Sequence, residues 1–335
     1  MIVGPNAVGK TNLIEAVQLL TEADSFRKPS WGDVVRWTSE SASLSLGAED
    51  GERRHDVRLM ISAAGKRNYT VNGKAKKSVS QVSGRIPCVV FTPDDLRIVK
   101  DSAERRRSSL DGVGAQLSHT YGTLRRDYER VVRQRNSLLK QDVVDEDTLA
   151  SWDERLVNLG SRLATHREGL FSRIVEKMID VHEEMAPGGE PGARYEPSWA
   201  RDGVSGGVEN ARAAMEAHLA LKRGEERARR LTLVGPHRDE IVFTLAGRDV
   251  RAFASQGQQR TIALALKLAE VAVVADVSGK RPVLLLDDVM SELDEERRHA
   301  LAATVGGVAQ TIMTTTNLGY FDESLIERAQ VVSLS

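Results

Sequence analysis

The chain has 335 residues, and its 47 basic and 48 acidic side chains leave a net charge of -1. This balance excludes a globally polycationic protein, so any contact with nucleic acid must come from local patches. The single cysteine, Cys88, excludes a disulfide framework and a cysteine-rich zinc cluster. Hydrophobic residues make up 41% of the chain, which is enough for a sizeable core, and the length allows about two domains.

Membrane insertion is not expected from the sequence. No segment has the roughly 20 consecutive apolar residues that cross a bilayer. The most apolar stretch, 261–275, is short and contains Lys267 and Glu270. The first residues also lack a basic and then apolar leader. We therefore expect a cytoplasmic, nucleoid-associated protein with no membrane partner.

The first third of the chain has an α/β pattern. The predicted elements are a strand fragment at 1–3, a Gly-rich turn, a helix through 12–20, alternating strands within 43–75 and a buried strand at 89–91. Asn72 and Gly73 are typical of a tight hairpin turn between two of these strands.

The middle third changes to helical periodicity. Two seams repeat with alternating spacings of four and three residues: Leu117, Tyr121, Leu124, Tyr128, Val131, Arg135 and Leu138, and then Leu149, Trp152, Leu156, Leu159, Leu163, His166 and Leu170. A short acidic turn separates them, which predicts an antiparallel helical hairpin. A third helix is predicted at about 209–229.

The last third returns to α/β. Strands are predicted at 231–234, 241–245, 283–286 and 310–315, and helices at 258–275 and 295–305. The apolar run 283–286 is typical of a buried parallel strand. The sequence thus predicts a discontinuous α/β head at 1–100 and 231–335, with a helical lobe at 101–230 inserted into it.

Gly4-Pro5-Asn6-Ala7-Val8-Gly9-Lys10-Thr11 fits the G-x-x-x-x-G-K-[ST] phosphate-binding loop, with a strand before it and a helix after it. Backbone amides and the helix N-terminus would cradle the phosphates of ATP. Lys10 would reach the β and γ phosphates, and the Thr11 hydroxyl would bind Mg²⁺. The alternative is a Gly-rich turn that fits by chance.

A pair of acids follows the buried strand 283–286. Asp287 would hold Mg²⁺ through water, and Asp288 would polarise the attacking water. The alternative role for such a pair is to cap a helix, but a cap does not require four apolar residues directly before it.

Two more segments are similar to motifs of ABC-type ATPases. Ser255-Gln256-Gly257-Gln258-Gln259-Arg260 resembles the signature motif, which contacts the γ-phosphate held by the other subunit of a dimer. The alternative is a plain helix start capped by Ser255. Ser291-Glu292-Leu293-Asp294 resembles the loop that runs between the two sites of such a dimer. The order and spacing of all four elements agree.

Together, these motifs resemble those of the RecF family of bacterial recombination mediator ATPases, which is related to SMC and Rad50 heads. The resemblance rests on the runs 255–261 and 284–294, on Gly235-Pro236-His237-Arg238-Asp239, and on Phe91-Thr92-Pro93-Asp94-Asp95-Leu96 with the basic run that follows. It implies an ABC-type P-loop head with a helical second lobe. It further implies an ATP-dependent homodimer on duplex or gapped DNA, slow hydrolysis, and RecR-type and RecO-type partners that help to place RecA.

The expected site follows from the motifs and this resemblance. Lys10 and Asp288 are the expected catalytic residues, and Thr11 and Asp287 the expected Mg²⁺ ligands. The expected ATP-binding residues are Gly4, Asn6, Gly9, Lys10, Thr11 and Asn12 and, from the second subunit, Ser255, Gly257 and Gln258.

The sequence departs from the family at its start, where strands that precede the P-loop strand are expected and Met1-Ile2-Val3 is only a fragment. The N-terminal strands therefore look truncated, or the true start lies upstream, and a truncated inactive homologue is one alternative. A second is an SMC or Rad50 structural head, which carries hundreds of coiled-coil residues. A third is a transporter ATPase, but the switch histidine is absent from the 314–316 region.

Arginine clusters provide candidate DNA contacts. Arg105, Arg106 and Arg107 form one cluster, and Arg126, Arg130 and Arg133 form a stripe on the first hairpin helix. Such contacts would be independent of DNA sequence, and the alternative for each cluster is a solvated helix face. We expect the four tryptophans to be packing residues rather than base platforms: Trp31, Trp37, Trp152 and Trp199.

Overall fold

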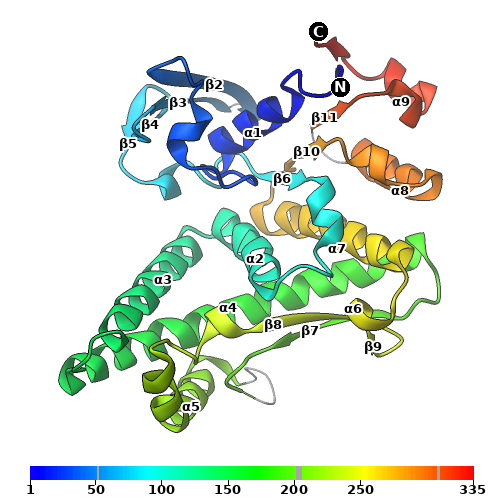
Figure 1. Cartoon of the computed structure of the whole chain (residues 1–335). Helices are drawn as coiled ribbons and strands as arrows, with labels where there is room; N and C mark the ends of the chain where they lie inside the picture. The colour runs from blue at the N-terminus through cyan, green and yellow to red at the C-terminus, as the bar shows by residue number, and fades with distance from the viewer. Residues whose placement is uncertain (51–52, 201–205, 308–309) are drawn as a thin grey trace. The chain divides into compact units, whose positions relative to one another are not determined.

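The computed structural model describes residues 1–50, 53–200, 206–307 and 310–335 (Figure 1). Contacts divide the chain into two compact units, Met1–Leu96 with Glu270–Ser335, and Arg97–Ala269. This division groups residues 231–269 with the helices, whereas the sequence analysis assigned them to the head. In the described part of the chain, no helix is both long and apolar enough to cross a bilayer.

The first unit contains two sheets and the helices around them. Its elements are β1 (Ile2–Val3), α1 (Lys10–Thr21), β2 (Ser41–Asp50), β3 (Arg53–Ser62), β4 (Arg67–Val71), β5 (Lys74–Lys76), β6 (Cys88–Phe91), the end of α7 (Gln256–Ser278), β10 (Val283–Asp287), α8 (Glu295–Gly307), β11 (Thr311–Thr315), α9 (Glu323–Glu327) and β12 (Val332–Ser333).

A parallel sheet of order β12-β1-β11-β10-β6 forms the centre of this unit. Leu284, Leu285 and Leu286 of β10 are all buried, because the strand has neighbours on both edges and packing on both faces. The strands point the same way, so their carboxyl ends lie at one edge of the sheet. The predicted α/β class with a parallel sheet is confirmed.

Helix α1 contacts both sheets of the unit (Figure 1). Ile14 packs with Cys88 and Leu285 of the parallel sheet. Leu19 and Leu20 belong to a second core with the inner face of the antiparallel sheet β2-β3-β4-β5. Helix α1 therefore contributes apolar side chains to both cores of this unit.

The hairpin predicted at Asn72-Gly73 is confirmed. Asn72 and Gly73 have φ of 49° and 74°, and they connect β4 to β5. Two successive left-handed residues match the twist of the flanking strands, which is why asparagine and glycine are favoured there.

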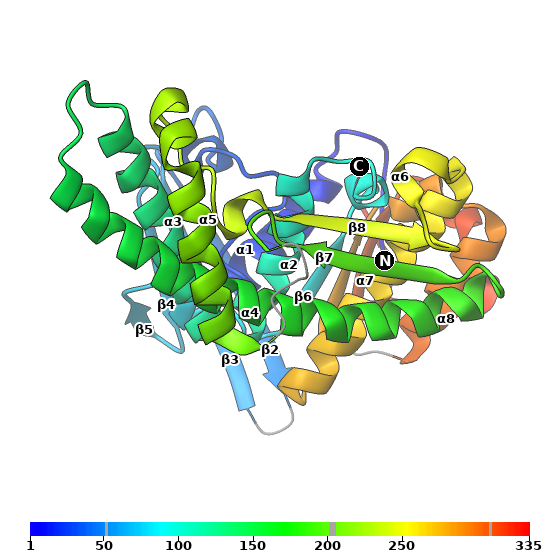
Figure 2. The same ribbon diagram turned by 90° about the horizontal axis from the view of Figure 1, so that it is seen from below.

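The second unit is mainly helical (Figure 2). Its elements are α2 (Ala103–Leu117), α3 (His119–Leu139), α4 (Glu146–Met185), β7 (Pro191–Glu196), α5 (Gly207–Arg229), β8 (Glu240–Leu245), β9 (Arg248–Asp249), α6 (Val250–Phe253) and the first part of α7. Helices α3 and α4 pack together as the predicted hairpin, and α5 packs on α4.

The seam on α4 shifts along its length. Leu156 and Leu163 are buried as predicted, but His166 is exposed and Arg167 is buried in its place. A straight helix has 3.6 residues per turn rather than 3.5, so the buried stripe drifts away from a strict heptad over 40 residues.

Two further predictions about this unit were wrong. The first seam was predicted to lie on one helix, but it spans two. The Ser118 side chain caps α3, so Leu117 is the last residue of α2 and the other seam residues lie on α3. The strand predicted at 231–234 does not form. Side chains bind its backbone instead: the Thr232 N–H donates to Asn136 Oδ1 at 2.7 Å, and the Leu233 N–H donates to Glu226 Oε1 at 2.7 Å.

Buried arginines connect the helices of the second unit. Arg135, 1% exposed, donates to Asp153 Oδ1 at 2.7 Å, to Glu226 Oε2 at 2.5 Å and to Thr232 Oγ1 at 3.0 Å. Arg167 of α4 donates to both carboxylate oxygens of Asp111 on α2, at 2.8 and 2.7 Å. A planar guanidinium can satisfy several acceptors at once, which offsets the cost of burying its charge.

Arg135→Ala should destabilise the protein by about 3–5 kcal/mol, because Glu226 and Asp153 would keep their charges without a partner. Urea denaturation followed by circular dichroism measures this change. Arg133→Ala, an exposed position on the same helix, is the control and should stay within about 0.5 kcal/mol of the parent. Equal effects of the two substitutions would contradict the structural role of Arg135.

The turn that contains His237 is closed by hydrogen bonds. His237 Nε2 lies 3.1 Å from the Thr232 carbonyl oxygen, which can only accept, so Nδ1 is the acceptor for the Tyr128 hydroxyl at 2.7 Å. Burial, and then the nearby guanidinium groups of Arg238, Arg107 and Arg167, lower the pKa of His237 to about 4.

The low pKa makes stability depend on pH. The unfolded imidazole titrates near pH 6.5, so His237 contributes its full stabilisation above that pH and loses up to about 3 kcal/mol as the pH falls towards 4. His237→Gln keeps polar contacts without a titrating group and should flatten the fall in unfolding free energy between pH 7 and 5. Exposed His119 gives the control, since His119→Gln should leave the slope unchanged.

Candidate functional site

The P-loop joins β1 to α1 at the carboxyl edge of the parallel sheet. Gly9 precedes α1 with φ of 102°, and Ala7 also has a positive φ of 67°. A glycine at the N-cap provides no side chain to occupy the first amides of the helix, which leaves them for an anion. A Cβ on Gly4 would lie 2.6 Å from the Leu334 carbonyl oxygen, so this position has no room for a side chain.

Lys10 folds back over its own loop. Its Nζ donates to the carbonyl oxygens of Gly4 at 2.7 Å and Pro5 at 2.8 Å, and the side chain is largely buried. The ammonium group therefore lies at the mouth of the loop, where phosphate oxygens could replace its carbonyl partners.

Hydroxyl and carboxylate groups of three elements meet at the sheet edge. The hydroxyls of Thr11 and Thr314 both donate to Asp287 Oδ1, at 3.0 and 2.8 Å. Thr314 also accepts from the Asp288 backbone N–H at 3.0 Å. The sequence analysis missed Thr314, because only the pairing of β11 with β10 brings this side chain to the two acids.

Asp288 carries an unpartnered carboxylate oxygen. The residue has a left-handed backbone with φ of 51°, and its Oδ1 is buried without a hydrogen-bond partner. Burial raises the pKa of this carboxyl group, the charge of Lys10 lowers it, and the carboxylates of Asp287 and Glu292 raise it. A buried polar atom without a partner is costly, so this oxygen is suited to a bound water molecule.

A cavity of about 220 Å³ lies between the P-loop and Asp288. It is lined by Asn6, Ala7, Gly9, Lys10, Thr11, Asn12, Arg27 and Asp288. Drug-sized ligands occupy roughly 300–1,000 Å³, so this volume suits a chain of phosphates rather than a whole nucleotide.

Arg27 is a second residue that the sequence analysis missed. It lies in the loop after α1, and its NH1 donates to Asn12 Oδ1 at 2.8 Å and to Glu15 Oε2 at 3.2 Å. These contacts hold a positive charge on the wall of the cavity. Only its position in three dimensions identifies it.

The donor set fits a small divalent cation. The Thr11 hydroxyl and Asp287 carboxylate are hard oxygen donors, and Asp288 Oδ1 has no partner. The described residues contain no cluster of three or more histidine, cysteine or acidic side chains that would form an all-protein metal cage. Mg²⁺ keeps several of its waters and takes few protein ligands, so this arrangement suits it.

The predicted signature segment belongs to the second unit and the P-loop to the first. Ser255 and Gln258 form a reciprocal cap at the start of α7: the Gln258 N–H donates to Ser255 Oγ at 3.2 Å, and the Ser255 N–H donates to Gln258 Oε1 at 2.9 Å. Both residues are exposed, and Gly257 is partly exposed. The helix cap expected from the alternative interpretation is therefore present, and the side chains of Ser255 and Gln258 remain exposed to solvent.

One predicted DNA contact was wrong. Arg106 is 3% exposed and donates to Glu240 Oε1 and to the carbonyl oxygens of Ile98 and Val99. It is a structural arginine that ties α2 to β8. Arg107 is also engaged, because its guanidinium donates to the Asp239 carbonyl oxygen, and Arg105 is half-buried.

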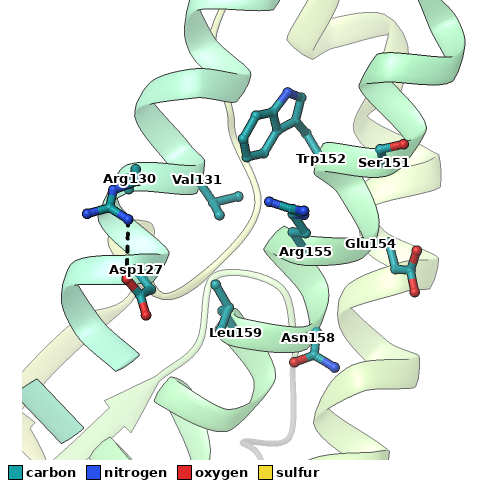
Figure 3. Close-up of a pocket in the computed structure, with 9 residues that line it drawn as sticks. All are labelled: Asp127, Arg130, Val131, Ser151, Trp152, Glu154, Arg155, Asn158 and Leu159. Atoms are coloured by element: carbon teal, nitrogen blue, oxygen red, sulfur yellow. Dashed lines mark ion pairs between the residues drawn. The ribbon is translucent and has the colours of Figure 1, made fainter. Parts of the chain in front are cut away.

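The other predicted stripe, Arg126, Arg130 and Arg133, is exposed on α3. Next to it, a cavity of about 670 Å³ lies between α3 and α4 (Figure 3). Arg130 pairs with Asp127 at 3.7 Å, and the Arg155 guanidinium lies 5.4 Å from the Trp152 ring centre. The stripe is thus accessible, although part of its charge is locally balanced.

Comparisons with known proteins cover nearly the whole chain. Residues 1–333 match the family model described as RecF/RecN/SMC N terminal domain. The chain is 39% identical over 319 residues to the DNA replication and repair protein RecF of Symbiobacterium thermophilum, which covers 95% of this chain and 85% of that protein. It is 37% identical over 339 residues to the protein of the same name from Geobacillus kaustophilus, at 99% and 90% coverage.

Solved structures agree with this relationship. The structure described as recombination mediator protein RecF-ATP in the RecFOR pathway matches with a TM-score of 0.87 and 30% identity, over 95% of this chain and 86% of that one. A SmcHead bound to the C-winged helix domain of ScpA matches with a TM-score of 0.51 and 15% identity, over 99% and 85%, which shows the shared fold alone. The phosphate-loop geometry, the paired acids after β10 and these matches together show that the chain belongs to the RecF family and has its ABC-type ATPase head.

Proposed function

We propose that this protein is an ATP-dependent DNA-binding ATPase of recombinational repair and replication restart. The observation that carries the proposal is the unpartnered Asp288 carboxylate oxygen, in a cavity that also contains Lys10 and the N-terminus of α1. This set provides a phosphate cradle and an acceptor for a water proton in one place. The ATP named in the description of the matched RecF structure supports the choice of nucleotide.

Each residue has a task in this proposal. The amides of the P-loop and Lys10 hold the β and γ phosphates. Asp288 accepts a hydrogen bond from water and orients it towards the γ-phosphorus, so that inorganic phosphate forms and ADP leaves. Thr11 would hold Mg²⁺ directly and Asp287 would hold it through water, and the ion when bound would neutralise phosphate charge. Aspartate reaches less far than glutamate, which favours slow turnover.

The exposed Ser255, Gly257 and Gln258 are assigned to the second half of a composite site. In an ATP-dependent homodimer, they would contact the γ-phosphate held by the partner copy. Such a dimer closes around duplex DNA near a gap or junction and opens after hydrolysis. The RecFOR pathway named for the matched structures supports RecR-type and RecO-type partners, with RecA loading as the outcome.

Asp288→Asn should bind ATP and form a long-lived dimer, because the amide is a poor acceptor for the water proton. Lys10→Met should lose ATP binding and remain monomeric. Light scattering with and without MgATP measures the molar mass, and exposed Lys100→Met is the control that should behave like the parent. An Asp288→Asn protein that stays monomeric with ATP would contradict the composite site and favour an inactive homologue.

Thr314 is proposed as a positioning residue for both acids. Thr314→Val removes the donor to Asp287 and the acceptor for the Asp288 N–H, and we expect ATP turnover to fall by about 10–100-fold with little change in ATP affinity. Thr314→Ser keeps the hydroxyl and should restore most of the rate. Steady-state kinetics with a separate nucleotide-binding titration gives both readouts, and failure of serine to rescue would assign Thr314 to packing instead.

A further inference from the structure

Two aromatic side chains of the described chain are strongly exposed. Trp37 is 98% exposed, so the expectation that all four tryptophans are packing residues is wrong for this one, and Phe253 is 72% exposed. The chain has six phenylalanines, and all except Phe253 are buried or partly buried. A single exposed apolar side chain is ordinary on a protein surface. What distinguishes Phe253 is its position, two residues before Ser255 of the predicted signature segment.

Hydrogen bonds fix the backbone that carries Phe253. This residue is the last of α6, the short helix that precedes α7 (Figure 1). The amide of buried Gln259, on α7, donates to the carbonyl oxygens of Val250 at 3.3 Å and Ala254 at 2.9 Å. The side chain of Gln259 therefore ties α6 to the start of α7. Phe253 is thus held beside the signature segment, although a ring fixed in water gives folding no hydrophobic gain.

Phe253 and Ser255 are close enough to contact one small molecule. The backbone of Ala254, between them, is extended. Two residues of extended chain span at most about 7 Å between Cα atoms, and a nucleoside triphosphate is longer than this separation. A hydroxyl group that meets the phosphate end of a nucleotide and a ring that meets its other end can therefore come from the same segment.

The cavity beside the P-loop covers the phosphates of a nucleotide but not its base. Its volume is about 220 Å³, and the described residues that line it are small, polar or charged. Pockets that enclose a whole drug-sized ligand are larger, roughly 300–1,000 Å³. A nucleotide bound here would place its phosphates in the cavity and leave its base outside, where a second surface can contact it.

We propose that Phe253 of one copy stacks on the adenine of the ATP that the other copy holds at its P-loop. The inference rests on the proposed ATP-dependent dimer, in which Ser255 meets the γ-phosphate of the partner's nucleotide. Aromatic rings and bases have flat faces that stack well, and every base has such a face. Phe253 is covered only when the dimer forms, which accounts for its exposure in a single copy. ATP thus joins the two copies through both of its ends.

The first test removes the ring in the Asp288→Asn background, which suppresses hydrolysis. Phe253→Ala should raise the dissociation constant of the ATP-bound dimer by about 100-fold, because each dimer has two such contacts and one stacked base contributes about tenfold. Phe253→Tyr keeps an aromatic face and should restore most of the affinity. Light scattering over a range of protein concentrations with MgATP measures the dissociation constant.

The matched control for this test is Leu221→Ala. Leu221 lies on α5 of the same unit and is 80% exposed, so its removal takes away a similar apolar surface far along the chain from the signature segment. It should leave the dissociation constant unchanged. Equal losses from Phe253→Ala and Leu221→Ala, or failure of Phe253→Tyr to restore the affinity, would overturn the stacking role.

The second test locates the base directly. The probe is 2-azidoadenosine triphosphate, whose base forms a covalent bond with its neighbours on illumination. In the Asp288→Asn dimer, the label should appear on the tryptic peptide 252–260, which contains Phe253 and the signature segment. Mass spectrometry identifies the labelled peptide. Label confined to peptides of the first unit would contradict the inference, because the base would then lie against the copy that holds the phosphates.

The outcomes separate this inference from the proposed function. If the Asp288→Asn protein dimerises with ATP but Phe253→Ala dimerises equally well, Phe253 is not the base contact and the proposed function stands. If the Asp288→Asn protein does not dimerise with ATP, the proposed function fails, and this inference fails with it.

Discussion

Parallel pairing of β1, β11 and β10 is the constraint on which the candidate site depends. The register aligns Ile2 with Thr314 and Asp287 with Thr314, so the chain leaves all three strands at one edge. The P-loop and the two acids are nearly 280 residues apart in the chain, yet the Thr11 hydroxyl lies 3.0 Å from Asp287. Ligands bind at this edge of α/β sheets because loops and helix N-termini gather there.

The second unit depends on a different kind of interaction. Its helices bury Arg106, Arg135 and Arg167, and each guanidinium bonds partners from more than one element. Apolar packing alone tolerates sliding of one helix past another, whereas a bidentate pair has only one good geometry. This arrangement suits a lobe that holds exposed segments, such as Ser255–Gln258 and the arginine stripe on α3, in defined positions. These hydrogen bonds also explain why Arg135 occupies a position of the otherwise apolar seam on α3.

The two sheets of the first unit have different surfaces because they have different neighbours. Strand β10 of the parallel sheet is paired on both edges, and its residues 283–286 are apolar throughout. The antiparallel sheet has α1 on one face only, so its strands alternate and its other face carries charge. Arg58 and Met60 face away from the core for the same reason that Leu59 faces into it.

Local patterns in the sequence determined much of this protein. The P-loop, the acids after a four-residue apolar run, the Asn72-Gly73 hairpin and the helical hairpin depend on neighbours in the chain, so their periodicity and turn chemistry are visible without coordinates. Tertiary structure alone decided the rest. Thr314 and Arg27 join the site only because the sheet and the loop after α1 bring them there. Arg106 was indistinguishable from Arg105 as a basic residue until the structure buried it against Glu240. Trp37 has the large aromatic side chain that is typical of a buried residue, and only the structure shows that this side chain is exposed. Burial is a sum over distant contacts, which is why a single sequence specifies the motif but not the surroundings of each side chain.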